Sequence, residues 1–238
     1  MNQQRTLDSY PQTMRDEIQR VRQVVADLHA ELPRYELVVW TAGNVSQRVR
    51  HPEVADGGAD LFVIKPSGVS YDDLTAESMV VCTLDGQLLD GGHAPSSDTA
   101  AHAYTYEHMP EVGGVVHTHS TYATAWAARG EEIPCVLTMM ADEFGGPIPV
   151  GPFAIIGDDS IGRGIVSTLR GSRGPAVLMA SHGPFTIGKD ARAAVKAAVM
   201  CEEVARTVHI AQQLGDPRPI DPAKIDSLYE RYQNVYGQ

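Results

Sequence analysis

Apolar residues recur at every third or fourth position near the start of the chain, which is the spacing of one helix face. This pattern predicts a helix over residues 13–32, with Pro33 directly after its end. A longer run with the same spacing predicts a helix over 189–214, with Gly215 as its cap. The inward-facing positions are Met14, Ile18, Val21, Val25, Leu28 and Leu32 in the first helix and Val195, Val199, Val204, Val208, Ala211 and Leu214 in the second.

Short β-branched runs alternate with polar turns through the rest of the chain. They predict strands over 35–40, 60–65, 79–84, 113–118, 153–157 and 175–180. Helical patterns cover 99–109, 120–129 and 159–170, a last helix follows "DPRPIDP", and residues 50–60 form a polar, glycine-rich loop. Because strands and helices mix along the whole length, we expect one α/β domain over residues 1–238, with residues 1–11 flexible.

Composition narrows the class of protein. A chain of 238 residues with 43% hydrophobic residues can bury a core, but it has no run of 18 apolar residues that would span a membrane. Its polar N-terminus lacks the apolar segment of a secretion signal, so we expect a cytoplasmic location. The net charge of −11, without a basic stripe, argues against a nucleic-acid partner. The cysteines at 82, 135 and 201 are far apart and indicate reduced, buried thiols rather than a redox or nucleophilic site.

The stretch "GGVVHTHSTYATAW" places His117 and His119 two positions apart at a strand end, so both imidazoles face the same side. With nine histidines in the chain, chance supplies such a pair roughly a third of the time, and the pair alone is weak evidence. His182 follows another predicted strand and precedes Gly-Pro. Three histidines with an open position are typical of a catalytic zinc site, although His182 by itself could be a turn residue bonded to backbone. The helical histidines at 29, 102, 108 and 209 indicate surface or hydrogen-bonded residues instead.

Three polar turns add a second kind of chemistry. They are "TAGNVS" (41–46), "KPSG" (65–68) and "PSSD" (95–98), and the last one opens a predicted helix. Lys65 adds a positive charge, and Ser96 and Ser97 stand where a helix N-terminus favours an anion. Each turn alone is a common structural feature. Together they would form a phosphate pocket.

The ordered motifs "GNVS … KPSG … PSSD … HTHS … SHGPF … YGQ" resemble the class II aldolase/adducin-type family, and within it the L-ribulose-5-phosphate 4-epimerases most closely. The resemblance runs from about residue 12 to the end of the chain. It implies a single three-layer α/β domain, with a central, mostly antiparallel β-sheet flanked by helices. It also implies a cyclic homotetramer with active sites at subunit interfaces.

The resemblance assigns ligands as well. His117, His119, His182 and Asp98 would bind Zn²⁺. Related aldolases carry Glu where this chain has Asp98, which favours an epimerase. The substrate phosphate would be held by residues of the three turns, with Lys65 as a contributor; they are Gly43, Asn44, Ser67, Gly68, Ser96 and Ser97.

Two further residues match catalytic positions of the family. Asp142, in "TMMADEFGG", matches its catalytic Asp, and Tyr236, in "NVYGQ", matches the Tyr that a neighbouring subunit contributes. Without the resemblance, Asp142 would be interpreted as a solvated loop acid and Tyr236 as part of a frayed tail. Arg231 is a candidate phosphate ligand from the neighbour. Met140 departs from the family pattern, which has a polar residue there and often His.

The activity that the resemblance implies is zinc-dependent conversion of L-ribulose 5-phosphate to D-xylulose 5-phosphate by cleavage and re-formation of the C3–C4 bond. The partners expected are a small sugar phosphate and other copies of the chain, with no nucleic acid and no membrane. One alternative is an aldolase acting on L-fuculose 1-phosphate or a similar sugar. The other is a non-catalytic interaction module similar to the adducin head.

Overall fold

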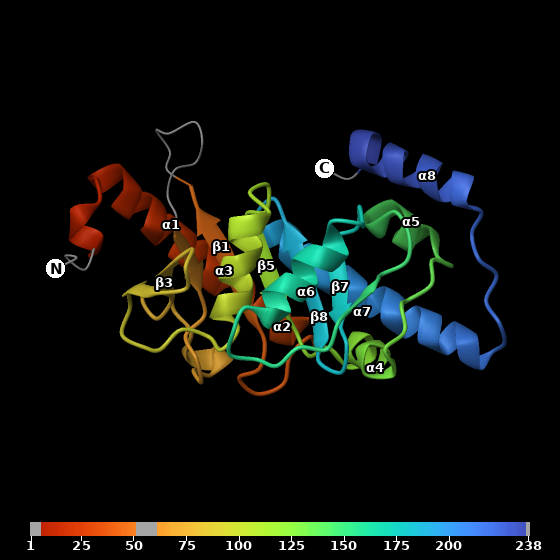
Figure 1. Cartoon of the computed structure of the whole chain (residues 1–238), viewed down its shortest axis with the longest axis horizontal. Coiled ribbons are helices and arrows are strands. Elements are labelled where there is room, and N and C mark those ends of the chain that lie inside the picture. The colour runs from red at the N-terminus through yellow and green to blue at the C-terminus, as the bar shows by residue number, and fades with distance from the viewer. Residues whose placement is uncertain (1–5, 51–60, 237–238) are drawn as a thin grey trace.

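The computed structural model describes residues 6–50 and 61–236 and consists of one sheet with helices on both faces (Figure 1). The helices are α1 (Gln12–His29), α2 (Glu31–Arg34), α3 (Thr99–His108), α4 (Thr121–Arg129), α5 (Thr138–Phe144), α6 (Ser160–Leu169), α7 (Ala191–Gln213) and α8 (Pro222–Arg231). The strands are β1 (Asn44–Val49), β2 (Leu61–Ile64), β3 (Val80–Thr83), β4 (Leu88–Asp90), β5 (Gly114–His117), β6 (Val150–Gly151), β7 (Ala176–Met179) and β8 (Gly183–Gly188). Shorter helical turns are η1 (Leu7–Ser9), η2 (Tyr71–Asp73) and η3 (Tyr232–Tyr236).

The described strands form a single eight-stranded sheet in the order β4-β3-β2-β1-β5-β8-β7-β6. All neighbours are antiparallel except β6 and β7. In the centre, His117 of β5 pairs with Asn44 of β1 on one side and with Phe185 of β8 on the other. The sheet therefore brings three chain segments that are far apart in sequence to one end of β5.

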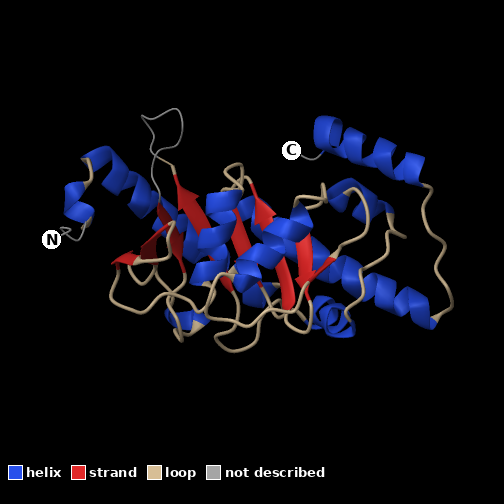
Figure 2. Cartoon of the chain, viewed as in Figure 1, coloured by secondary structure: helices blue, strands red, loops and turns tan. Residues whose placement is uncertain are grey.

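Helices cover both faces of the sheet, as Figure 2 shows. Val116 of β5 packs into the cluster formed by α1 and the start of α7, while its neighbour Val115 packs into the cluster of α3 and α6. A third cluster joins α4, α5 and the later part of α7 to β7. This alternation of inward positions produces the three layers, and it confirms the predicted α/β class with a mostly antiparallel sheet.

The N-terminal helix shows how the sequence pattern is used. Its predicted face is fully buried against β1 and β2, and each such side chain contributes roughly 1.5–3 kcal/mol. The helix breaks at Ala30 rather than running to residue 32, and Pro33 lies within the short α2. Near the break, the His29 Nδ1–H donates to the Val25 carbonyl (2.6 Å), and its Nε2 accepts from the Val45 amide (2.9 Å). His29 therefore ties α1 to β1.

The strand predicted over 35–40 is wrong. This segment is a loop in which Glu36 and Trp40 have positive φ (58° and 59°), a conformation that no strand contains. Leu37 is buried in the core, whereas Val39 and Trp40 face outward and are exposed by 74% and 88%. The strand begins later, at Asn44, inside the predicted turn 41–46.

The strand predicted over 153–157 is also wrong. Phe153, Ile155 and Ile156 lie on an exposed loop, and the edge strand is the short β6 before it. Strands β4 and β8 and helix α5 had no sequence prediction. The inward assignment of Leu214 fails too, because α7 has left the core at that point and the side chain is 88% exposed.

Other expectations hold within the described residues. The helices near 99–109, 120–129 and 159–170 correspond to α3, α4 and α6, and the strands near 79–84, 113–118 and 175–180 to β3, β5 and β7. All three cysteines are buried and free. None of the helices among residues 6–50 and 61–236 is both long and apolar enough to cross a membrane. The loop predicted over 50–60 lies, from residue 51 on, outside the described residues.

Candidate metal and anion site

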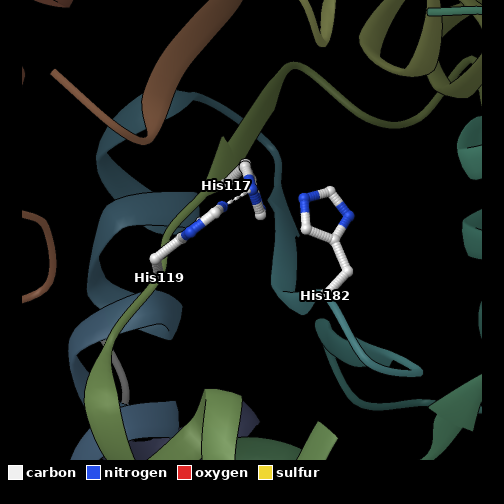
Figure 3. Close-up of side chains that lie close together, drawn as sticks. All are labelled: His117, His119 and His182. Carbon is white, nitrogen blue, oxygen red and sulfur yellow. Dashed lines mark hydrogen bonds between the residues drawn. The ribbon is translucent and has the colours of Figure 1, made fainter. Parts of the chain in front are cut away.

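Three histidines meet at one end of the central strands. His117 is the last residue of β5, and His119 follows it after one residue, so both side chains reach the same side as predicted. Their Nε2 atoms lie 2.9 Å apart. His182 comes from the turn between β7 and β8, which the strand order places beside β5. Figure 3 shows its ring facing the other two, and the candidate ligand atoms of all three lie within 4.8 Å of one another.

The surroundings prepare His117 to bind a metal through Nε2. Its side chain is 1% exposed, and its Nδ1 lies 3.0 Å from the Pro184 carbonyl, which can only accept. The proton is therefore on Nδ1, and the lone pair on Nε2 points into the cluster. The Phe185 ring stacks on the imidazole with centroids 4.1 Å apart and fixes its plane.

Burial keeps His117 and His182 in the form that binds cations. Desolvation, followed by repulsion from His182 and His119, lowers the pKa of His117 well below its usual value. Desolvation also lowers the pKa of His182, although the Asp98 carboxylate opposes this effect. Since a metal ligand must be neutral imidazole, the site is poised for a cation at neutral pH.

Asp98 adds a carboxylate beside the histidines. It is 5% exposed and precedes α3, and its Oδ2 accepts a hydrogen bond from Asn44 Nδ2 (2.7 Å). The Asn44 amide also donates to Ser96 Oγ at 3.0 Å. The Oδ1 atoms of Asp98 and of Asn44 are both buried without a hydrogen-bond partner. Asp98 lines the same cavity as the three histidines, although its oxygens do not belong to the group of ligand atoms that lie within 4.8 Å of one another. A buried carboxylate in this lining fits a divalent cation, because the ion would offset its charge.

The predicted residues share one cavity of about 320 Å³. Eleven of the thirteen residues proposed from sequence line it: the four metal candidates, Lys65 and the six turn residues Gly43, Asn44, Ser67, Gly68, Ser96 and Ser97. The three turns converge because β1 and β2 are neighbours and because Ser96 N–H bonds to the Lys65 carbonyl (3.1 Å). The three polar turns and the histidines therefore face one space.

Lys65 supplies the positive charge of this cavity. The side chain is 2% exposed, and its Nζ donates to the carbonyls of Thr41 (3.2 Å) and Pro66 (3.3 Å) and lies 5.4 Å from the centre of the Tyr71 ring. Desolvation lowers the pKa of Lys65. No carboxylate among the described residues forms an ion pair with it. A buried ammonium without a counter-ion is costly, so this arrangement suits an anionic ligand.

The turn at 41–44 depends on close backbone contact. Gly43 has φ +78°, and a Cβ there would lie 2.6 Å from Val38 Cγ1 and 2.9 Å from the His117 carbonyl. The Tyr71 hydroxyl donates to the Ala42 carbonyl (2.8 Å) and braces the same turn. Sequence reasoning missed Tyr71, which lies outside the three motifs.

Asp142 and Tyr236 are the two predicted residues outside the cavity. Asp142 lies on α5, which packs under α8 and η3 in the C-terminal part of the chain (Figure 1). The Gln233 Nε2 reaches its carbonyl at 3.5 Å, and Arg231 opposes the effect of burial, which raises the pKa of Asp142. The backbone of Tyr236 ends η3, and its side chain lies outside the described part. Met140, near Asp142, is fully buried in the core and does not line the cavity.

A larger hollow, of about 610 Å³, opens near the C-terminal ends of α3 and α6 and beside Lys189. Arg170, Arg173 and Lys189 line it with Glu111. Within the described residues it contains no group of side chains placed to hold a metal, whereas the histidine cavity does. The side chains that line a cavity are therefore a better guide to its chemistry here than the cavity volume.

Comparison with solved structures agrees with the fold described above. Among solved structures, an L-fuculose 1-phosphate aldolase superposes with a TM-score of 0.81 at 24% identity, covering 90% of this chain and 96% of that one. At this identity the likeness concerns the fold alone. YgbL from Klebsiella pneumoniae, described as a putative aldolase/epimerase/decarboxylase, has a TM-score of 0.75 and 27% identity over 89% of this chain and 98% of its own.

Sequence comparison then identifies the family. The family model "Class II Aldolase and Adducin N-terminal domain" matches residues 23–209, and the chain belongs to this family, as the motifs predicted. L-ribulose-5-phosphate 4-epimerase UlaF of Salmonella paratyphi C (strain RKS4594) is 41% identical over 234 residues, which cover 93% of this chain and all of that protein. The protein of the same name from Salmonella typhi has the same identity and coverage.

Proposed function

We propose that this protein is a zinc-dependent L-ribulose-5-phosphate 4-epimerase that forms D-xylulose 5-phosphate. The observation that carries the proposal is the shared cavity, where His117, His119 and His182 face the same space as the unpaired Lys65. A metal site beside an anion site suits a sugar phosphate. The relatives named as epimerases, at 41% identity over nearly the whole chain, support this substrate over other phosphates.

The chemistry required is set by the substrate. The hydrogen on C4 of L-ribulose 5-phosphate is not acidic, because C4 is not adjacent to the C2 carbonyl. Inversion at C4 can instead proceed when a base removes the C4 hydroxyl proton and the C3–C4 bond breaks. The bond electrons then remain on the three-carbon fragment, and C4 becomes the aldehyde carbon of glycolaldehyde phosphate. Rotation of this aldehyde followed by bond formation and protonation of the new C4 oxygen gives the epimer.

Four side chains would hold the metal: the three histidines and Asp98. When bound, zinc would supply Lewis-acid stabilisation of the negative charge on the three-carbon fragment, an effect worth several kcal/mol. The chain's own contribution is to keep the imidazoles neutral and oriented, as the Pro184 contact does for His117.

Lys65 and the three turns would bind the phosphate. This tether has a mechanistic role, because glycolaldehyde phosphate must turn over within the cavity without escaping. Lys65 is held by carbonyls on the cavity wall, so its charge stays in place while the aldehyde end rotates. A charge-assisted contact to the phosphate would also remove the cost of the unpaired ammonium.

Asp142 and Tyr236 are proposed to transfer protons from opposite faces of the aldehyde. Both belong to the part of the chain formed by α5, α8 and η3, and neither is among the residues that line the cavity. They would therefore act in the cavity of a neighbouring copy, within a homotetramer. Exposed apolar residues next to the cavity support such an interface: Val39 and Trp40 directly precede Thr41, and Ile155 precedes Ile156.

In the direct test, the purified, zinc-loaded protein is incubated in parallel with L-ribulose 5-phosphate and with L-fuculose 1-phosphate. We expect D-xylulose 5-phosphate from the first, with no free glycolaldehyde phosphate, and little turnover of the second. Release of an aldehyde from L-fuculose 1-phosphate at the higher rate would instead identify the aldolase alternative. Absence of bound zinc and of both activities would support the non-catalytic module. We also propose a cytoplasmic location, which fits the free cysteines.

A further inference from the structure

A buried histidine lies behind the metal candidates and has no role in the mechanism above. His102 is on α3, one helical turn after Asp98, and its side chain is 0% exposed. Its Nδ1 is 2.7 Å from Ser46 Oγ, while its Nε2 has no hydrogen-bond partner in the described part of the chain. An unsatisfied buried nitrogen of this kind requires an explanation.

The neighbouring groups determine which nitrogen of His102 carries the proton. The Tyr106 hydroxyl, also fully buried, lies 2.7 Å from Ser46 Oγ, and either group could be the donor. If Ser46 donated, the Tyr106 proton would have no acceptor among the described residues, so we assign the Tyr106 hydroxyl as the donor to Ser46. Ser46 in turn donates to Nδ1 of His102. Because Nδ1 accepts this hydrogen bond, the ring proton of His102 is on Nε2.

The Nε2–H group needs an acceptor, and two buried oxygens nearby lack a donor. They are Oδ1 of Asp98 and Oδ1 of Asn44, which belong to one hydrogen-bonded pair. Asp98 is the better candidate for two reasons. It is four residues before His102, with the His102 N–H bonded to the Asp98 carbonyl (3.1 Å), so the two side chains share a helix face. Its charge also acts on the imidazole more strongly than any other neighbouring charge.

We propose that His102 is a positioning residue: its Nε2–H and Asp98 Oδ1, both unpaired in this structure, form a hydrogen bond in the metal-loaded protein and fix the orientation of the carboxylate. The chain Tyr106–Ser46–His102 fixes the tautomer that makes this donation possible. The inference rests on the proposed function, in which Asp98 is the fourth metal ligand. Outer partners of this kind change metal affinity by roughly 10–100-fold when they are removed.

Two substitutions distinguish the roles of the two ring nitrogens of His102. The amide of His102→Gln reaches the position of Nε2 and keeps a donor for Asp98, but loses the contact with Ser46. The shorter amide of His102→Asn reaches the position of Nδ1 and keeps Ser46, but leaves Asp98 without a donor. Both variants lose packing in the core. Their thermal stabilities without metal therefore serve as a matched control for structural damage.

The experiment measures zinc affinity by competition with a chelator and records the visible spectrum of the Co²⁺-loaded proteins. We expect His102→Asn to bind zinc roughly 10–100-fold more weakly than the wild type and to show an altered Co²⁺ spectrum. His102→Gln should stay close to the wild type in both. Equal zinc affinities and spectra for the two variants, or a larger loss in His102→Gln, would overturn the role of His102.

The same measurements on the wild type and on Asp98→Asn keep the two proposals apart. Tight zinc binding by the wild type that weakens in Asp98→Asn supports the proposed metal site, whatever His102 does. A wild type that binds no zinc, or an Asp98→Asn variant that binds it unchanged, would contradict the proposed site and the inference together. Ser46→Ala should weaken binding less than His102→Asn, since it removes only control of the tautomer.

Discussion

The histidine cavity and the surface around Asp142 both carry predicted functional residues, but they differ in how far their polar groups are buried and hydrogen-bonded. The histidine cavity is made of strand ends and turns. In it Asn44 and Asp98 are buried and hydrogen-bonded to each other, and Asn44 also donates to the half-buried Ser96. The surface around Asp142 is formed by α5 under α8, a helix with no buried residue. The η3 turn that follows α8 exposes Val235 by 68%.

The difference indicates which half of the chemistry each part can perform alone. The cavity already has the donor set for a metal and an unpaired charge for a phosphate, and both require a rigid, dehydrated setting. Proton-transfer groups on an open surface lack that setting. They acquire it only when another surface covers them. The comparison therefore predicts separate losses from the two parts, with metal and phosphate binding on one side and proton transfer on the other.

The largest effect should follow from removing a histidine of the cavity. We expect His117→Ala, or treatment with a strong chelator, to reduce kcat/KM by at least about 10³-fold, because the Lewis acid is lost. Metal analysis should show substoichiometric zinc in the variant. His209→Ala, on α7 outside the cavity, is the matched control and should keep both. A fully active His117→Ala protein would refute the metal site.

Loss of the proton-transfer groups should be nearly as severe but leave the metal in place. Asp142→Asn and Tyr236→Phe are each expected to lower kcat by roughly 10²–10⁴-fold. Zinc content should equal that of the wild type, since neither residue lines the cavity. Zinc loss in either variant would contradict the assignment of metal binding to the cavity and of proton transfer to the surface around Asp142. Asp216→Asn, an exposed acid near the start of α8, serves as the control.

Lys65→Met should separate binding from stability. We expect KM for the sugar phosphate to rise about 100-fold, because a buried charge-assisted contact is lost. The same variant should raise the free energy of unfolding of the ligand-free protein by about 1–2 kcal/mol, since an unpaired buried ammonium is removed. Substrate saturation curves and urea denaturation measure the two effects. Unchanged KM in Lys65→Met would remove Lys65 from the anion site.

The smallest effect concerns pH and the buried His29 between α1 and β1. Burial lowers the pKa of His29 to about 3, whereas an unfolded histidine titrates near 6.5. Between these values the unfolded chain binds the extra proton, so stability falls as pH decreases. From pH 7 to pH 5 this amounts to roughly 2 kcal/mol for His29. Denaturation of the chelator-treated protein at several pH values should show it.

His29→Gln is the control for this effect. The variant should be less stable than the wild type at pH 7, because the bridge between α1 and β1 is disturbed. Its stability should nevertheless depend less steeply on pH between 7 and 5. An equal slope in the two proteins would mean that His29 is not the buried neutral group described above.

Some of this site can be predicted from sequence because its signals are local. The spacing of His117 and His119 and the capping turn at 95–98 are visible within a few residues. The strand predicted at 35–40 failed for the opposite reason. Its apolar side chains resemble a buried strand, but only Leu37 is buried. Glu36 and Trp40 take positive φ, and Val39 and Trp40 face outward next to the cavity.

The role proposed for His102 and the location of Asp142 could not be predicted from sequence, because both depend on tertiary structure. The helical spacing of four between Asp98 and His102 is a signal in the sequence. It has no meaning until Ser46 and Tyr106 are brought to the other side of the ring. The motif order marks Asp142 as a candidate catalytic residue. Only the packing of α5 under α8 separates it from the cavity of its own chain.

Co-assembly of two inactive variants tests most directly whether the two parts complete each other between copies. His117→Ala lacks the metal side, and Asp142→Asn lacks the proton-transfer side. In randomly mixed tetramers, about a quarter of the interfaces would join an intact metal side to an intact Asp142, so roughly a quarter of wild-type activity should return. His117→Ala mixed with His182→Ala should remain inactive. If Asp142 acts within its own chain, the first mixture stays inactive as well, and the account is contradicted.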